Sequence, residues 1–149
     1  MQISENGFVF SDNKELLKLN SIHQYLSRES YWAKNIPLET LTRSIENSLC
    51  FGVYKDETQI GFARWITDKA TFAWLCDVYI LEAYRGLGLS KKMMSFMIFH
   101  PDLQGLRSYR LSTLDAQGLY EQFGFKALKD PDLQMEITIA NPYLQSATE

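Results

Sequence analysis

The sequence predicts a single α/β domain in which helices flank a mixed, mostly antiparallel twisted sheet. Its 149 residues include 46% hydrophobic and 22% charged residues, a balance typical of one globular domain with a substantial core. Apolar residues alternate with polar ones along the central part of the chain, as in strands, and recur at helical spacing in the flanking segments. A strand, a glycine-bearing turn, a helix and a further strand then follow in order, which adds a crossover connection.

The first third of the chain predicts a short strand and two helices. Phe8–Phe10 is the strand candidate. Asp12 is placed to cap a helix that runs to about Ser27, because Glu15 follows three residues later and apolar residues recur on one face. Pro37 suits the first turn of a second helix, which continues to about Leu49.

The middle of the chain predicts an antiparallel sheet. Leu49–Tyr54 and Gln59–Ile66 are apolar runs separated by a short polar turn, so we expect them to pair as a hairpin. A longer strand, Thr71–Ile80, follows the next turn. Strict alternation along it places Trp74 and Cys76 on one face and Asp77 on the other.

The last third predicts two helices and two strands. Leu89–Met97 has helical spacing and is ended by His100-Pro101, since the residue before a proline is disfavoured in a helix. Arg107–Leu114 is the next strand candidate, and Asp115–Phe123 is a short helix with its apolar residues on one side. Met135–Ile139 predicts the final strand.

Composition disfavours several classes of protein. The formal charge of −3 gives no net basic field for nucleic acid, and no apolar run approaches the roughly 20 residues that span a bilayer. The first residues lack the basic and apolar regions of a secretion signal, so we expect a cytoplasmic protein with neither nucleic acid nor membrane as partner. Cys50 and Cys76 lie in apolar strands and are expected to be reduced, and no cysteine or histidine spacing suggests a metal site.

The turn Arg85-Gly-Leu-Gly-Leu-Ser90 is the most informative feature of the chain. It stands between a strand and a helix, where free backbone N–H groups and the helix dipole favour phosphate oxygens. Taken alone, a two-glycine turn is equally compatible with a tight connection. A dinucleotide fingerprint would need a third glycine at Lys91, and a Walker loop would need a different glycine spacing, so neither of these motifs fits.

Two segments resemble the GNAT superfamily of N-acetyltransferases. Residues 77–94 resemble its acyl-CoA pyrophosphate loop, Arg/Gln-x-x-Gly-x-Gly/Ala, with Ser90 where the family usually has glycine or alanine. Residues 113–125 resemble its later Ala-x-x-Leu-Tyr and Gly-Phe pattern, with Thr113 where many members carry asparagine. The resemblance covers about residues 8–139 and implies one acyltransferase domain over residues 1–149.

The resemblance implies an enzyme that transfers the acetyl group of acetyl-CoA to a primary amine of a small molecule or peptide, by direct attack and without an acyl-enzyme. The implied coenzyme-binding residues are Val78, Tyr79, Ile80, Arg85, Gly86, Leu87, Gly88, Leu89, Ser90, Thr113, Ala116 and Tyr120. Two other functions stay open: a non-catalytic acyl-CoA-binding sensor, and a transferase for a larger acyl-CoA. Dimers are frequent in this superfamily, so a homodimer is also open.

Two residues are candidates for catalysis. Tyr120 matches the family tyrosine that protonates the departing CoA thiolate, and a tyrosine stays protonated at neutral pH, as an acid must. The alternative is a core tyrosine whose hydroxyl is satisfied. Asp77, beside the expected thioester strand, is the first candidate for accepting a proton from the amine. The alternative for Asp77 is a pair with a cation.

The acceptor side is expected between the first two helices. Tyr31 and Trp32 could form an apolar or cation-holding wall there, with Trp65 added to it. Glu29 and Asp68 join Asp77 as candidate counterions for a cationic acceptor. The alternative for the aromatic residues is simple core or lid packing.

Overall fold

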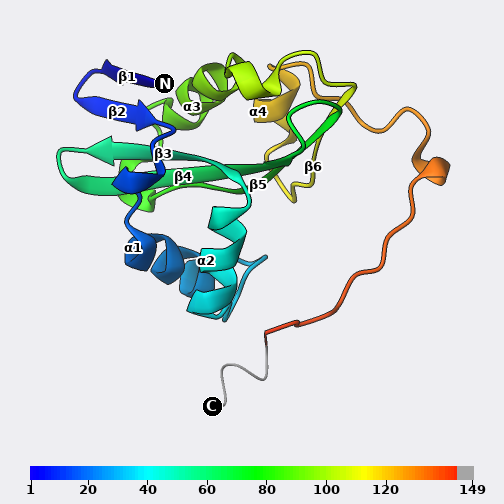
Figure 1. Ribbon diagram of the computed structural model, residues 1–149, viewed down its shortest axis with the longest axis horizontal. Coiled ribbons are helices and arrows are strands. Elements are labelled where there is room, and N and C mark those ends of the chain that lie inside the picture. Colours follow the sequence, from blue (N-terminus) through cyan, green and yellow to red (C-terminus); the bar gives the residue numbers. More distant parts are fainter. Residues whose placement is uncertain (144–149) are drawn as a thin grey trace.

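The computed structural model describes residues 1–143 as six strands in one sheet with helices on both faces (Figure 1). The strands are β1 (Gln2–Glu5), β2 (Phe8–Ser11), β3 (Leu49–Lys55), β4 (Thr58–Thr67), β5 (Phe72–Ile80) and β6 (Ser108–Leu111). Their order in the sheet follows the sequence. Every pair is antiparallel except β5 with β6, which is parallel. The predicted fold class is therefore confirmed.

Within residues 1–143, four α-helices cover the sheet. They are α1 (Leu19–Gln24), α2 (Leu38–Glu46), α3 (Leu89–Ile98) and α4 (Gln117–Glu121). Figure 1 shows α1 and α2 below one face of the sheet, with α3 and α4 above the other. Short 3₁₀ turns occur at Lys14–Leu16, Glu82–Tyr84, Pro101–Leu103 and Pro131–Leu133, and one π-helical turn at Tyr25–Glu29. Among residues 1–143, no helix is both long and apolar enough to cross a bilayer.

The sheet separates two hydrophobic cores. Trp65 and Met93 belong to the core under α3, whereas Phe62 and Leu41 belong to the core under α1 and α2. Neighbouring side chains of a strand point to opposite faces, so the apolar run of β4 supplies both cores. This explains why β3 and β4 are almost continuously apolar in the sequence.

A β-bulge interrupts β5 at Asp77. Ala73 and Leu75 face the core under α3, but after Asp77 the residues facing that core are Val78 and Ile80. One extra residue has therefore been inserted, and Asp77 has a left-handed φ of 55°. The strict alternation expected along this strand is wrong beyond Cys76, because the bulge shifts every later side chain to the other face.

The amino-terminal region differs from expectation in two ways. β1 pairs with β2 through a tight turn at Asn6-Gly7, both with positive φ, a hairpin signal that the sequence interpretation overlooked. The single helix expected after Asp12 is instead a 3₁₀ turn capped by Asn13, then α1 and the π-helical turn. Asp12 does not cap a helix, because its carboxylate bonds His100 and the amino group of Met1.

The remaining predicted elements agree with the structure except the last one. Residues 135–139 form no strand: Met135 is 97% exposed and Ile137 95% exposed, within an extended arm that stands away from the body (Figure 1). The arm begins after Lys129, and Tyr143 at its end packs against the core under α1 and α2. The alternation that predicted a strand is present, but the described residues offer these side chains no neighbour.

Candidate active site

The site is a wedge between β5 and β6. The two strands pair only from Phe72 to Leu75 on β5, and the pairing of β5 with β4 skips Asp77 and Val78. The backbone of β5 at the bulge therefore has no ladder partner on either side. A cavity of about 390 Å³ fills the wedge, and we call it the wedge cavity. Its lining includes Trp32, Arg64, Cys76, Asp77, Val78, Thr113, Ala116 and Tyr120.

The glycine turn lies just beyond the carboxyl end of β5. Gly86 and Gly88 have φ of 80° and 76°, values that favour glycine, and Gly88 directly precedes α3. Backbone N–H groups of residues 86–91 have no hydrogen-bond acceptor among the described residues. A Cβ built on either glycine would meet nothing within 4 Å, so the turn is open. This arrangement suits an anion such as a pyrophosphate.

Arg85 fastens the turn to the end of β5. Its Nε donates to the carbonyl oxygen of Ile80 at 3.0 Å, and its guanidinium donates to the hydroxyl of Tyr25 at 3.1 Å. Tyr25 in turn stacks on Tyr79, with ring centroids 3.9 Å apart. The turn is thus tied to a buried aromatic pair, and the side chain of Arg85 already has two partners.

Tyr120 lies on the opposite wall of the wedge, on α4. Only 7% of it is exposed, yet its hydroxyl has no hydrogen-bond partner among the described residues and the side chain lines the wedge cavity. Burial, with a smaller contribution from Tyr31, raises the pKa of Tyr120 to about 12. Thr113 holds the turn that precedes this helix, where its hydroxyl accepts a hydrogen bond from the N–H of Ala116 at 3.0 Å. Tyr120 is therefore protonated and free to donate.

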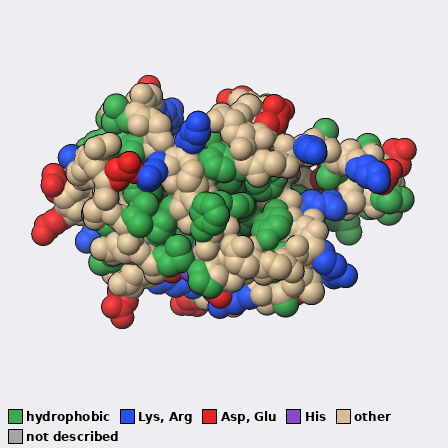
Figure 2. All heavy atoms as spheres, turned by 90° about the horizontal axis from the view of Figure 1, so that it is seen from above, with side chains coloured by type: hydrophobic (Ala, Val, Ile, Leu, Met, Phe, Trp, Pro, Cys, Tyr) green, Lys and Arg blue, Asp and Glu red, His purple; other side chains and the backbone are tan. Residues whose placement is uncertain are grey.

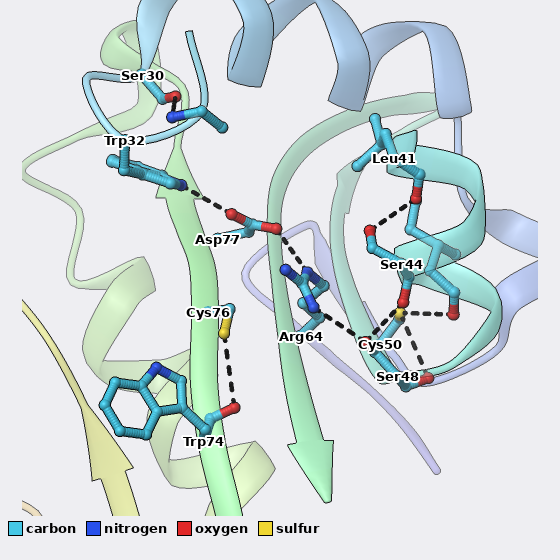
Figure 3. A network of polar contacts seen from close by, with 12 residues as sticks. Ser30, Trp32, Leu41, Ser44, Ser48, Cys50, Arg64, Trp74, Cys76 and Asp77 are labelled. Carbon is cyan, nitrogen blue, oxygen red and sulfur yellow. Dashed lines mark hydrogen bonds and ion pairs between the residues drawn. The ribbon is translucent and has the colours of Figure 1, made fainter. Parts of the chain in front are cut away.

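A polar network joins β5 to β4 at the bulge, beside the wedge cavity (Figure 3). Asp77 accepts from Nε of Arg64 at 2.6 Å with one carboxylate oxygen, and from Nε1 of Trp32 at 2.7 Å with the other. Arg64 also donates to Ser48 at 3.1 Å. Burial lowers the pKa of the Arg64 guanidinium, but the Asp77 carboxylate outweighs this effect and the net shift is upward. The sequence analysis did not single out Arg64. An arginine within an apolar strand nevertheless indicates a buried charge that needs a partner.

Comparison with known proteins identifies the family. Residues 46–127, more than half of the chain, match the model of the acetyltransferase (GNAT) domain. The chain belongs to the GNAT acetyltransferase family. It is therefore an acyltransferase, as the two sequence motifs predicted.

Individual relatives agree with this GNAT assignment. A GNAT-family protein of Xanthomonas campestris pv. campestris has a similar structure, with a TM-score of 0.91, 44% identity and coverage of 95% of this chain and 99% of that one. A protein of Gibberella zeae that is named as an acetyltransferase is 30% identical, over 92% of this chain and 89% of its own length. An acetyltransferase structure from Clostridium acetobutylicum, solved with acetyl-CoA, shares the fold at a TM-score of 0.66 and 18% identity, covering 88% of this chain and 94% of that one.

The GNAT fold brings together only part of the expected acceptor side. Trp32 lines the wedge cavity, and the ring of Tyr31 packs edge-on against the ring of Trp32. The hydroxyl of Tyr31 accepts a hydrogen bond from the N–H of Leu114 at 3.3 Å. Trp65 is fully buried in the core under α3, so its side chain does not face the cavity. Tyr79 and Ile80 are also buried and can offer only backbone groups to a ligand.

Two expected counterions lie elsewhere. Asp68 organises the turn before β5. Its carboxylate accepts from the hydroxyl of Thr71 and from the N–H groups of Ala70, Thr71 and Phe72, and these bonds lower its pKa. Glu29 is exposed at the end of the π-helical turn and lines none of the cavities described. Asp77 is thus the one expected acidic residue that the fold places in the wedge cavity.

Both cysteines are free thiols. Cys50 is buried, and Cys76 lines the wedge cavity beside Asp77. Burial raises the pKa of each thiol to about 11, so neither is ionised at neutral pH. Within residues 1–143, no cluster of histidine, cysteine or acidic side chains could hold a metal ion.

Proposed function

We propose that this chain is an acetyl-CoA-dependent N-acetyltransferase that acetylates a primary amine of a small molecule or peptide by direct attack. One observation carries the proposal. The unpaired backbone at Val78 and the free hydroxyl of Tyr120 border the same wedge cavity, and the open turn 85–90 follows the same end of β5. The Clostridium acetobutylicum relative, solved with acetyl-CoA, supports the choice of donor.

Coenzyme binding in this proposal depends mainly on the backbone. The N–H groups of residues 86–91 hold the pyrophosphate, aided by the amino-terminal dipole of α3. The edge of β5 from Val78 to Ile80 and the residues after β6, including Thr113, border the pantetheine arm. Acetyl-CoA supplies an activated thioester. Since glycine at 86 and 88 leaves the turn open, the chain can approach the phosphates closely.

Two groups act on the thioester in this proposal. The N–H of Val78 donates to the carbonyl oxygen, where negative charge develops when the amine attacks. The hydroxyl of Tyr120 donates its proton to the departing sulfur, and its raised pKa keeps it protonated until then. No partner within the described chain competes for this hydroxyl.

Asp77 is the proposed acceptor of the proton lost by the amine, directly or through water. An alkyl amine with a pKa of about 10.4 is mostly protonated at neutral pH, so a negative side chain in the cavity also favours its entry. Each carboxylate oxygen of Asp77 already accepts one hydrogen bond, and each retains a further lone pair. Trp32 provides an aromatic surface beside it.

Thermal unfolding with and without acetyl-CoA tests the donor. A ligand at 100 times its Kd adds about 2.7 kcal/mol, worth roughly 5–10 °C in Tm for a domain of this size. Gly88→Glu should abolish the shift by placing a carboxylate in the turn. Gly88→Ala is the matched control, because it introduces the same left-handed strain without the charge. A parent chain that shows no shift would contradict acetyl-CoA as donor.

Turnover of Tyr120→Phe tests catalysis separately from binding. We expect kcat to fall by about 10²-fold or more, with an unchanged thermal shift, since a general acid contributes roughly 10²–10⁴-fold. Folding should be preserved because the hydroxyl makes no hydrogen bond to a described residue. Equal loss of turnover and coenzyme binding would instead indicate a structural role for Tyr120.

Amide substitutions test the acceptor site. Asp77→Asn should raise the acceptor KM and lower kcat, whereas Glu29→Gln, whose side chain is exposed and borders no described cavity, should change neither. A panel of amines assayed by thiol release provides the readout. If both variants behave like the parent, Asp77 has no part in acceptor chemistry.

A further inference from the structure

A second acidic residue borders the wedge cavity. Asp115, which lies just before α4, lines this cavity together with Asp77. Asp115 is exposed, and its carboxylate makes no hydrogen bond or ion pair with another residue of 1–143. The carboxylate of Asp77, in contrast, is shared between Arg64 and Trp32. The cavity is therefore bordered by one negative charge that has protein partners and by one that has none.

The charges around the wedge cavity do not cancel. Arg64 is the single basic residue among the described residues that line it, and its guanidinium is engaged by Asp77 and Ser48. No lining residue is left to neutralise Asp115. A cavity with this balance attracts a cationic ligand and repels a carboxylate.

An aromatic pair connects the two carboxylates. Trp32 donates from Nε1 to Asp77 at 2.7 Å, and its ring centroid lies 5.0 Å from that of Tyr31. The hydroxyl of Tyr31 accepts from the N–H of Leu114, the residue before Asp115, at 3.3 Å. The pair thus reaches from one carboxylate to the neighbour of the other, so both acids border the same aromatic surface.

The rest of the lining also suits a ligand that is cationic and partly apolar. Trp74, Tyr120 and Tyr143 line the wedge cavity with Trp32. Aromatic faces attract ammonium groups and offer apolar surface to an alkyl chain. Tyr120 is only 7% exposed, and its hydroxyl has no partner among the described residues, which independently marks this space as a ligand site.

The outer surface offers no comparable selection by charge. Figure 2 shows the face over α3 and α4, where acidic and basic side chains lie interspersed toward the rim. Mixed charges give no strong field for either sign, and physiological salt screens exposed charges beyond about 8 Å. Selection of the acceptor by charge therefore depends on the groups that line the cavity.

We propose that the acceptor is a straight-chain diamine, whose reacting amine lies at Asp77 and whose second ammonium group pairs with Asp115. This inference rests on the proposed acetyl transfer and names the class of amine. The reacting amine gives a proton to Asp77 and forms the new N–C bond, while the C–S bond breaks and the CoA sulfur takes the proton of Tyr120. The second ammonium group keeps its proton and its charge throughout.

The same pairing limits the reaction to one acetyl group. After one turnover the product carries an uncharged amide at one end and an ammonium group at the other. If its free amine approached Asp77, the amide end would stand at Asp115, where it cannot form an ion pair. A mono-acetylated diamine is therefore a poorer acceptor than the diamine itself.

Matched acceptors test the second charge. Straight-chain diamines from diaminopropane to diaminooctane are assayed with the parent chain, each beside the monoamine and the ω-amino acid of the same length. We expect the best diamine to exceed its monoamine by about tenfold in kcat/KM, chiefly through KM, and the amino acid to be the poorest acceptor. Mass spectrometry should find one acetyl group per diamine. Equal use of diamines and monoamines would overturn this inference while leaving acetyl transfer intact.

Substitution at Asp115 assigns the preference to this residue. Asp115→Asn should remove most of the diamine preference and leave kcat/KM for monoamines unchanged, whereas Asp115→Glu should retain the preference. Glu121→Gln is the matched control, because Glu121 lies on α4 but does not line the wedge cavity. Equal losses for diamines and monoamines in Asp115→Asn would mean that Asp115 only supports the fold, and would overturn the proposal.

Binding separates a failure of this inference from a failure of the proposed function. Each amine is added to the chain with CoA present, and Tm is measured. The best diamine should raise Tm more than its monoamine, and Asp115→Asn should abolish the difference. That result without turnover of any amine would retain the diamine site and overturn acetyl transfer. Absence of both binding and turnover would overturn both.

Discussion

Asp77 accepts a hydrogen bond from Arg64 at 2.6 Å at the point where the β4–β5 register shifts. Only 7% of the Asp77 side chain and 15% of the Arg64 side chain are exposed. The ion pair therefore stands between two strands whose ladder is interrupted, and it holds the bulge at Asp77 beside the wedge cavity. This relationship connects the stability of the sheet to the shape of the candidate active site.

Removal of Arg64 should be costly because it leaves a buried carboxylate unpaired. We expect Arg64→Met to lower the free energy of unfolding by about 3 kcal/mol, in the range measured for broken buried ion pairs. The double variant Arg64→Met with Asp77→Asn should cost no more than Arg64→Met alone, since the amide is neutral. Urea unfolding of the four chains measures this coupling. Additive losses would show that the pair contributes no mutual stabilisation.

The raised pKa of Tyr120 predicts the pH profile of turnover. The rate should rise with pH as the amine acceptor loses its proton, and it should not decline near pH 10, where an ordinary tyrosine ionises. The decline due to Tyr120 is expected near pH 12. A pH series of kcat/KM within the stable range of the fold measures this profile. A falling limb centred at pH 10 or below, absent in Tyr120→Phe, would contradict it.

The same group contributes to alkaline stability. The pKa of Tyr120 is about 12 in the folded chain and about 10 in the unfolded chain. The contribution of this tyrosine to the free energy of unfolding is therefore fully present below about pH 10. It is lost as the pH rises from about 10 through 12. Tyr120→Phe should therefore lose less stability than the parent over this interval, measured by urea unfolding. Parallel curves for the two chains would exclude a shifted pKa.

Asp12 predicts a loss of stability at acid pH. Burial raises its pKa, but hydrogen bonds from the Met1 ammonium and His100 outweigh this effect and the net shift is downward. A lowered folded pKa gives stability that is present above about pH 3.8 and is lost as the pH falls through the folded value. Asp12→Asn should cost up to about 1 kcal/mol at pH 7, and the difference should vanish in strong acid.

Urea unfolding from pH 7 to pH 2 measures the effect of Asp12. Glu57→Gln is the control, because Glu57 is exposed in the β3–β4 turn and makes no hydrogen bond or ion pair with a described residue. Its curve should follow that of the parent. A pH-independent difference for Asp12→Asn would mean that its ionisation does not matter.

Two glycines should respond oppositely to alanine. A Cβ on Gly52 would lie 2.2 Å from the hydroxyl of the buried Tyr54, so Gly52→Ala forces the packed ring to move and should cost about 1–3 kcal/mol. Gly118, in α4, has open space around it, and Gly118→Ala should stabilise the chain by about 0.5–1 kcal/mol. Thermal unfolding compares the two. A neutral Gly52→Ala would show that Tyr54 moves freely.

The sequence by itself determined the fold class, most of the elements and the position of the glycine turn. These features are local: alternation and helical spacing follow from backbone geometry, and the glycine pair marks a turn between a strand and a helix, where free N–H groups favour an anion. The match of residues 46–127 to the GNAT domain confirms the family that these motifs indicated, whereas the roles of Gly86, Gly88 and Tyr120 stay predictions. Asn6-Gly7 was an equally local signal for a hairpin, and it was overlooked.

Only the tertiary structure decided which side chains meet. The partnership of Asp77 with Arg64 and Trp32 joins residues 13 and 45 positions apart, and it depends on a bulge that no periodicity reveals. Burial likewise excludes the side chain of Trp65 from the expected acceptor side, and hydrogen bonds hold Asp68 in a turn. The strand pattern of residues 135–139 was correctly read as apolar alternation, but a strand forms only where another edge pairs with it. Pairing is a long-range property, so the chain's local preferences cannot decide it.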